Sequence, residues 1–245
     1  MQRVVAAETL DNLAPDHPAA ERSRRDLVRV HRVMGTRTIV CRGWRTLLSP
    51  ERAGAPLRIL ELGAGDGTLL LGVARSLAPR WPHVTLTLLD RQSIVSAATL
   101  AGFAEVGWST QVQVADIMEW AADPDDRGLG MPSRRWDLIT TTLFLHHFEG
   151  AAFDQILAAI ASRCDRFFAC EPRRSWLALA GSHLIGAIGA NAVTRGDAVL
   201  SVHAGFEGLE ISGRWPQAGH AWQSREFAAG LFSHCFSAQR TGAGP

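Results

Sequence analysis

The chain has 245 residues and a formal net charge of +1, from 25 basic and 24 acidic side chains. This length suits one large domain, and the balanced charge gives no general reason to expect nucleic acid or an anionic membrane as a partner. The chain contains neither lysine nor tyrosine. A lysine or tyrosine general base is therefore excluded, and any such base must be His, Asp, Glu or Cys.

The four cysteines, Cys41, Cys164, Cys170 and Cys235, are scattered and form no Cys-x-x-Cys pair. Their spacing favours neither a zinc site nor a redox motif, and free thiols are typical of a reducing cytoplasm. The first residues lack the apolar run of a secretory signal, and the longest apolar stretch, residues 176–192, is interrupted by glycine, serine and histidine. We therefore expect a cytoplasmic protein without stable membrane insertion.

The first fifty residues predict a helical extension. Apolar positions follow a helical period over residues 24–34, with Ser23 as the N-cap, and again over residues 36–48. Residues 22–45 carry eight arginines against a single acid. The simpler interpretation is a solvated helix face, and the alternative is a lid that meets an anionic substrate or partner.

An apolar strand over residues 58–62 then runs into a glycine turn that opens a helix over residues 67–78. From Glu61 the chain reads Glu-Leu-Gly-Ala-Gly-Asp-Gly. A dinucleotide fingerprint has its last glycine where this chain has Thr68, and no Gly-Lys-Ser/Thr follows to make a phosphate-binding loop. An acid at the strand end also repels phosphate, so the motif favours a ligand with a cationic head.

This motif resembles the first motif of the class I S-adenosylmethionine-dependent methyltransferases, in which alternate glycines follow an acid. The resemblance implies S-adenosyl-L-methionine as the cofactor, bound beyond the carboxyl ends of the strands. It also implies a doubly wound α/β fold with a seven-stranded, mostly parallel sheet. Glu61 and the backbone of the turn would hold the methionine part of the cofactor. The turn residues concerned are Gly63, Ala64, Gly65 and Asp66.

Strands and helices continue to alternate after this motif. Such alternation implies a parallel sheet with helices on both faces. Strands are expected over residues 83–90, 108–115, 137–142 and 166–170, and helices over residues 93–103, 117–121 and 153–162.

Acids also follow the second and third strands. Asp90 ends the second strand, where a carboxylate can accept hydrogen bonds from both ribose hydroxyls. Asp116 follows the third strand, and the resemblance implies that its carboxylate accepts from the adenine amino group while the Ile117 N–H donates to the ring. Arg91 either packs on the adenine or is a surface arginine. Each acid could instead cap a helix, but their succession at strand ends favours the cofactor site.

After the fourth strand, residues 140–148 read Thr-Thr-Thr-Leu-Phe-Leu-His-His-Phe. Many small-molecule methyltransferases have a similar stretch here, where the strand end faces the transferable methyl group. His146 or His147 is therefore the candidate general base, with His146 preferred, unless both cap the next helix or lie in the core. Leu143 completes the implied cofactor contacts. Glu171, which ends the fifth strand, would orient the base, bind a substrate hydroxyl or form a structural turn.

The tail differs from the alternating core. Residues 175–205 are helical and apolar in pattern, and Trp176 and Phe206 would suit an aromatic or alkyl acceptor or pack in the core. Residues 222–227 and 231–239 predict a hairpin. The resemblance implies that the sheet ends in this antiparallel hairpin and that the helical insertion shapes the substrate pocket. We expect a single methyltransferase domain over residues 1–245, divided into a helical extension (1–50), a cofactor-binding core (56–172), a substrate-pocket insertion (173–221) and the hairpin (222–240).

Further stretches are similar to a bacterial group near the ubiquinone and menaquinone methyltransferases. They read Arg-Ser-Arg-Arg-Asp-Leu, Phe-Leu-His-His-Phe, Cys-Glu-Pro-Arg-Arg-Ser and Ala-Gly-Leu-Phe-Ser-His-Cys-Phe. Members of this group are often associated with type III polyketide synthases and methylate phenolic products such as alkylresorcinols. The resemblance therefore implies O-methylation of a phenolic or lipidic small molecule. A homodimer stays open.

Two alternatives stay open: C-methylation of a quinol or resorcinol ring, and a non-catalytic cofactor-binding partner of a biosynthetic enzyme. A nucleic-acid methyltransferase is disfavoured, because Thr-Thr-Thr-Leu stands where base-modifying enzymes have an Asn/Asp-Pro-Pro-Tyr-type stretch. No group of acids and histidines at metal-ligand spacing is visible in the sequence, so we expect no metal dependence.

Overall fold

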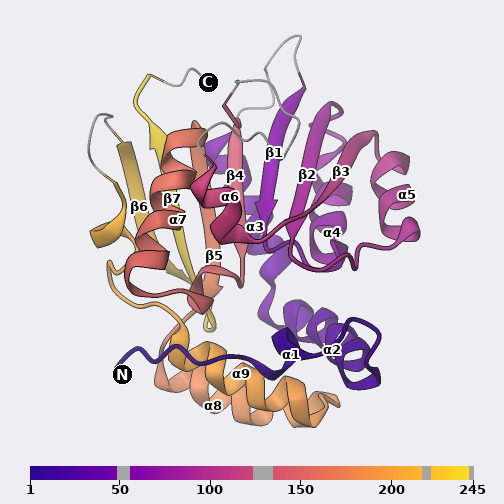
Figure 1. Cartoon of the computed structure of the whole chain (residues 1–245), viewed down its shortest axis with the longest axis vertical. Coiled ribbons are helices and arrows are strands. Elements are labelled where there is room, and N and C mark those ends of the chain that lie inside the picture. The colour runs from indigo at the N-terminus through magenta and orange to yellow at the C-terminus, as the bar shows by residue number, and fades with distance from the viewer. Residues whose placement is uncertain (49–55, 124–134, 217–221, 243–245) are drawn as a thin grey trace.

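A computed structural model describes residues 1–48, 56–123, 135–216 and 222–242. The described residues form a seven-stranded sheet with the order β3-β2-β1-β4-β5-β7-β6 (Figure 1). The first five strands are parallel, whereas β7 pairs antiparallel with both β5 and β6. The predicted doubly wound α/β fold with a terminal antiparallel hairpin is confirmed. The strands are β1 (Leu57–Leu62), β2 (Val84–Asp90), β3 (Trp108–Val114), β4 (Leu138–Thr142), β5 (Arg166–Pro172), β6 (Trp222–Ala229) and β7 (Ser233–Arg240).

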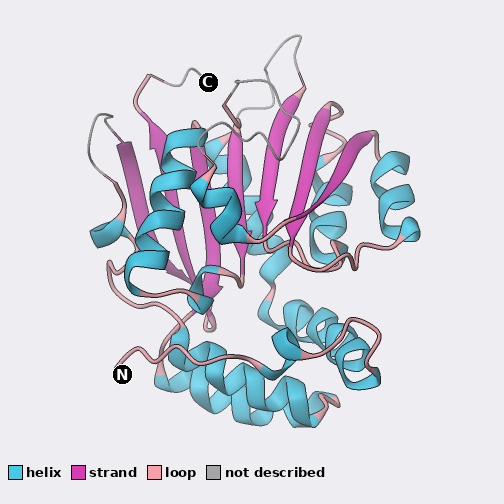
Figure 2. Cartoon of the chain, in the orientation of Figure 1, coloured by secondary structure: helices cyan, strands magenta, loops and turns pink. Residues whose placement is uncertain are grey.

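Helices cover both faces of the sheet (Figure 2). One buried cluster joins α3, α4 and α5 to one face, and a second joins α6 and α7 to the other. α3 therefore belongs to the sheet layers, although the sequence grouped it with the N-terminal extension. These helices are α3 (Thr36–Leu47), α4 (Thr68–Leu77), α5 (Ala97–Glu105), α6 (Ile117–Ala122) and α7 (Gly150–Arg163).

Three tryptophans fix α3 against the sheet. Trp44 is fully buried and stacks on Trp81 and Trp108, with ring centroids 6.4 and 6.5 Å apart. Its indole N–H donates to the Thr140 hydroxyl on β4. Truncation of a buried tryptophan to alanine costs about 3–5 kcal/mol, so this stack holds the first helix of the layer firmly to the strands.

The predicted start of the helix over residues 24–34 is wrong. α2 begins five residues before Ser23, at Pro18, and the His17 ring accepts the N–H of Ala19 as the N-cap. Proline suits this position because its φ is already helical and its missing N–H has no partner there. Ser23 is instead buried within α2 and hydrogen bonds with Asn191, so it joins the helix to the insertion.

The remaining helices gather beyond the carboxyl ends of the parallel strands (Figure 1). There α9 packs against α1, α2 and α8. Residues 3–12, which we call the N-terminal strap, run along this group. The Asp197 carboxylate on α9 accepts the N–H groups of Thr9 and Leu10, and the N–H of Val4 donates to the His203 carbonyl. These elements are α1 (Thr9–Asn12), α2 (Pro18–Met34), α8 (Trp176–Leu184) and α9 (Ala192–Ala204), with the short 3-10 turns η2 (Leu145–His147) and η3 (Ile185–Ile188). A further 3-10 turn, η4 (Ser212–Arg214), lies beside β6.

Candidate active site

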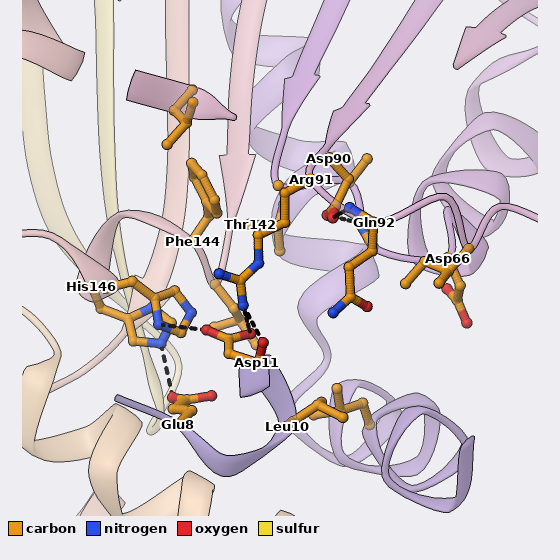
Figure 3. Close-up of a pocket in the computed structure, with 18 of the residues that line it drawn as sticks. Glu8, Leu10, Asp11, Asp66, Asp90, Arg91, Gln92, Thr142, Phe144 and His146 are labelled. Carbon is orange, nitrogen blue, oxygen red and sulfur yellow. Dashed lines mark hydrogen bonds and ion pairs between the residues drawn. The ribbon is translucent and has the colours of Figure 1, made fainter. Parts of the chain in front are cut away.

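A cavity of about 570 Å³ lies between the carboxyl ends of the strands and the N-terminal strap (Figure 3). Residues from β1, β2 and β4 and the loops that follow them form one wall, and the strap with α2 forms the opposite wall. Every residue that the sequence predicted for the site lies on the wall of this cavity, except Glu171. The predicted residues on the wall are Glu61, Gly63, Ala64, Gly65, Asp66, Asp90, Arg91, Asp116, Ile117, Leu143, His146 and His147.

Glu61 is a buried carboxyl group at the end of β1. It is 2% exposed, and its Oε2 atom has no hydrogen-bond partner among the described residues. Burial raises the pKa of Glu61 to about 8, and the negative charge of Glu171 adds to the rise. A buried acid without a full set of partners is costly, so this group is suited to a cationic ligand that supplies the missing charge.

The glycine turn presents bare backbone to the cavity. Gly63, Gly65 and Gly67 have φ values of +73°, +57° and +74°, which glycine adopts at little cost. A Cβ atom on Gly63 would lie 2.1 Å from the Phe144 ring, whereas one on Gly65 would meet nothing within 4 Å. Gly63 is therefore required by packing, and the open side of Gly65 lets a ligand approach the main chain.

Asp90 ends β2, as predicted, and braces the glycine turn. Its carboxylate accepts the N–H of Gly65 at 2.8 Å and the N–H of Gln92 at 2.9 Å. A carboxylate offers about four acceptor positions, so two further hydrogen bonds from a ligand are compatible with this arrangement. The structure thus joins the predicted ribose acceptor to the turn that precedes it.

Asp116 and Arg91 both make contacts within the protein. Asp116 accepts the N–H of Met118 at 2.7 Å and caps α6, which places Ile117 beside it on the cavity wall. The Arg91 guanidinium hydrogen bonds with the carbonyl of Asp11 in the strap (Figure 3). Arg91 therefore connects the cofactor side of the cavity to its opposite wall.

His146 is held between two carboxylates, Glu171 and Glu8, of which Figure 3 shows Glu8. Its Nδ1 atom lies 3.0 Å from Glu171 Oε2, and its Nε2 atom lies 3.4 Å from Oε1 of Glu8 in the strap. Burial lowers the pKa of His146, but the hydrogen bonds and charges of the two acids outweigh it and raise the value to about 9. The same pairing shifts the pKa of Glu8 downward against the effect of its own burial. The ring is therefore a buried imidazolium at neutral pH.

Glu171 organises the loop that carries His146. Its carboxylate is fully buried and accepts the backbone N–H groups of residues 144–146, together with the Thr141 hydroxyl. Leu143, just before this loop, has a φ of 52°, an uncommon conformation for a side chain of its kind. Glu171 lies behind His146 and off the cavity wall, so it is placed to orient the histidine and not to touch a substrate.

His147 occupies a different environment from its neighbour. It is partly exposed, and its Nδ1 atom lies 3.6 Å from the Asp11 carboxylate. Burial and the adjacent charge of His146 lower its pKa. The two histidines are thus set apart electrostatically, with His146 favoured in its charged form and His147 in its neutral form.

Sequence reasoning missed the acids of the strap. Glu8 lies 138 residues before His146, and no motif marks it. Glu8, His146 and His147 present possible metal-ligand atoms within 4.8 Å of one another. The expectation that the chain has no such group of acids and histidines is therefore wrong, because the fold assembles one from distant positions. Metal independence itself stays a prediction.

The acceptor side of the cavity is built mainly from the N-terminal region. The strap and α2 contribute apolar side chains there, whereas Ser201 is the residue of the described insertion on this wall. Of the two aromatic residues considered from the sequence, Trp176 is 75% exposed and Phe206 is buried against Phe153. Neither lines the cavity. The N-terminal and apolar lining residues include Val5, Ala6, Leu10, Leu27, Val28 and Phe148.

The strand order and the helix layers define a Rossmann-like methyltransferase fold. Residues 35–240 match the model of a family described as a methyltransferase domain. The chain belongs to this family. A comparison with curated protein sequences gives no match.

Solved structures give the same fold. The chain is similar to the plantazolicin methyltransferase BpumL in complex with SAH, with a TM-score of 0.63 and 12% identity over 92% of each chain. It is also similar to an O-methyltransferase family protein from Burkholderia thailandensis, with a TM-score of 0.59 and 17% identity, over 93% of this chain and 62% of that one. A third match is the plantazolicin methyltransferase BamL in complex with SAH and a triazolic desmethylPZN analog, with a TM-score of 0.60 and 14% identity over 92% of each chain.

The protein belongs to a methyltransferase family, and its Glu-Leu-Gly-Ala-Gly-Asp-Gly motif implies S-adenosylmethionine as the cofactor. The residues of the cavity fit this cofactor on three structural grounds. The unpartnered oxygen of Glu61 suits a cationic group, the open side of Gly65 admits a ligand to the backbone, and Asp90 retains acceptor positions beside the turn.

Proposed function

We propose that the enzyme methylates a hydroxyl group of a phenolic small molecule, with His146 as the general base. The observation that carries this proposal is the fixed orientation of His146. Because Glu171 holds the Nδ1 atom from the buried side, Nε2 is the nitrogen that points away from Glu171, toward the strap. An orienting carboxylate behind a histidine is a recurrent arrangement for general-base catalysis.

The cofactor, when bound, supplies a methyl group already activated on its sulfonium. The protein must therefore hold both reactants, exclude water and manage one proton. We expect Glu61 to hold the cationic amino group of the cofactor and Asp90 to accept from its ribose. Asp116 and Ile117 would recognise the adenine.

The His146 ring holds a proton while Glu8 contacts Nε2, so it acts as a base only once that proton has left and the acceptor has displaced the Glu8 carboxylate. An unperturbed phenol has a pKa of about 10, and His146 has a pKa of about 9. Proton transfer between groups with similar pKa values carries only a small free-energy penalty. A phenol hydroxyl that takes the place of the Glu8 carboxylate at Nε2 would also remove one of the two charges that keep the ring protonated.

The lining of the cavity supports an apolar, aromatic acceptor. The cavity that His146 lines is also lined by the apolar side chains of Leu10, Leu27 and Phe148 and by small side chains of the strap. Ligand pockets of this kind bind apolar bodies through their walls and orient them with a few polar groups. An alkylated phenol matches both features.

The test is incubation of the enzyme with S-adenosylmethionine and a panel of alkylresorcinols, quinols and catechols, read by mass spectrometry. Proton spectra of the product distinguish an aryl methyl ether from a methyl group on the ring, and the proposal requires the ether. His146→Gln should lower kcat by roughly 100-fold or more and leave SAH affinity within about twofold, since a general base contributes about 10²–10⁴-fold. His147→Gln is the matched control and should retain most of the activity. SAH binding without turnover on any phenol would favour a non-catalytic partner.

A further inference from the structure

Helix α8 and the turn η3 present an uncharged, apolar surface to solvent. Trp176 is 75% exposed, Leu177 52%, Leu184 69% and Ile188 36%, and we call these four residues the apolar ridge. Residues 175–194 contain no aspartate, glutamate, lysine or arginine. Exposed apolar side chains are common singly, but their grouping on one charge-free helical segment is typical of an interaction surface.

The apolar ridge extends onto the hairpin of the sheet. The turn between β6 and β7 carries Leu231, which is 56% exposed. The next residue, Phe232, packs directly against α8, since a Cβ atom on Gly181 would lie 2.7 Å from its ring. The turn therefore lies beside the helix and adds Leu231 to the same part of the surface.

Arginines border the end of the apolar ridge. The Arg29 guanidinium on α2 donates to the carbonyl of Gly189, at 3.3 Å, just after η3. The Arg195 side chain lies next to Gly186 within η3. Both contacts place a long basic side chain at the edge of an apolar segment, where its stem can pack and its charge can reach solvent.

The exposed face of α2 continues this basic border. Arg22, Arg25, Arg29 and Arg32 follow one another at three- and four-residue spacing and are all exposed. The acid within this run, Asp26, is 1% exposed and pairs with Arg29 and Asn191, so it offsets Arg29 and leaves Arg22, Arg25 and Arg32 as the outer charge. The net charge of +1 for the whole chain thus conceals a local surplus of arginine beside the ridge.

We propose that the apolar ridge and the arginine face of α2 dock the enzyme on an anionic lipid bilayer. A helix that lies in the membrane interface combines an apolar face with tryptophan and leucine and a basic border that meets anionic headgroups. Among the described residues, no helix has the length and apolar character needed to cross a membrane.

Docking in this way would bring the active site close to the membrane. The helices α2, α8 and α9 all lie beyond the carboxyl ends of the strands (Figure 1), and residues of α2 and α9 line the cavity. α9 packs on α8 on one side and contributes Ser201 to the cavity wall on the other. An alkylated phenol that partitions into a bilayer would thus be concentrated next to the site. This consequence rests on the proposed acceptor, whereas the docking itself does not.

The test is sedimentation of the full chain with vesicles of phosphatidylcholine alone or mixed with phosphatidylglycerol, at low and high salt. Binding should require the anionic lipid and weaken with salt. Trp176→Glu and Leu184→Glu should each weaken binding roughly tenfold or more, because burial of a large apolar side chain is lost. Arg25→Gln combined with Arg32→Gln should weaken it by roughly 25-fold, at about fivefold per charge. Arg80→Gln, between α4 and β2 at the amino ends of the strands, is the matched control and should bind as the wild type does.

Equal binding to neutral and anionic vesicles, or no binding to either, would overturn the proposal. So would a dimer in solution, measured by light scattering, that Trp176→Glu converts to a monomer, because a second copy would then cover the ridge. Methyl transfer to a short, water-soluble phenol without vesicles serves as an independent readout. It should be unchanged in Trp176→Glu, so failure of docking and failure of the proposed activity give different results.

Discussion

Replacement of Glu61 by glutamine separates the charge of this side chain from its shape. Glutamine keeps the volume and the polar end of the side chain but cannot ionise. In the folded protein the pKa of Glu61 is raised from 4.5 to about 8 because the group is buried. The folded state therefore binds this proton more tightly than the unfolded chain does, and the wild type loses stability as the pH rises from about 4.5 to about 8.

The size of this loss follows from the shift. At about 1.4 kcal/mol for each pKa unit, the full effect is up to roughly 5 kcal/mol, and about 2.5 kcal/mol of it falls between pH 5 and pH 7. Glu61→Gln lacks this dependence. We therefore expect the free energy of unfolding of the variant, relative to the wild type, to rise by about 2–3 kcal/mol over the same pH range. Urea denaturation at pH 5, 6 and 7 measures the difference, in which other titrating groups cancel.

Burial favours the protonated form of Glu61, whereas a bound cofactor should favour its ionised form. A cationic amino group next to Glu61 favours the ionised carboxylate, so the wild type should release close to one proton when it binds SAH at pH 7. Calorimetry in two buffers with different ionisation enthalpies measures this release, and Glu61→Gln should bind roughly tenfold more weakly without it. A stability difference that stays constant with pH, together with no proton release in the wild type, would refute the reasoning about Glu61.

Three further predictions concern the cavity. Gly65→Ala should cost only about 1 kcal/mol of stability yet weaken SAH binding, since its Cβ enters open space at a φ of +57°. Gly63→Ala should lower the Tm markedly, because its Cβ meets the Phe144 ring. Equal SAH affinity in Gly65→Ala and wild type would contradict the expectation for Gly65. Asp90→Asn should weaken SAH binding at least tenfold by calorimetry while circular dichroism stays native, and unchanged affinity would exclude the ribose contact. Methyl transfer should persist in excess chelator, and activity that is lost there and restored by a divalent cation would show that the Glu8, His146 and His147 group holds a metal.

The sequence predicted most of the fold because the sheet is encoded locally. The strands β1, β2, β4 and β5 are short, mostly buried runs that end in a turn or an acid. The glycines at 63, 65 and 67 fix the turn after β1 through their positive φ values. The predicted helix boundaries were less accurate where more than one residue could serve as the N-cap. Serine is a favoured N-cap residue, but α2 begins earlier, at Pro18 with His17 as the N-cap. Ser23 instead hydrogen bonds with Asn191.

The candidate site was predictable on one wall only. The residues that directly follow strands could be predicted as site residues, because the carboxyl ends of parallel strands lie at one edge of the sheet. The opposite wall comes from the strap, whose contacts depend on how α9 packs. Glu8 and Asp11 carry no local signature, and a pairing such as Glu8 with His146 is decided by tertiary packing that no motif records.

The strap also couples access to the cavity with the state of a proton. Its residues 8–11 close one side of the cavity and supply one of the two carboxylates that keep His146 charged. Any motion that lifts these residues removes that carboxylate, and the pKa of His146 must then fall, since Glu171 alone stabilises the imidazolium. By thermodynamic linkage, a lower pH favours the closed strap and a higher pH favours the open one. Exchange of ligands through this opening would therefore be gated by acidity, independently of the chemical step.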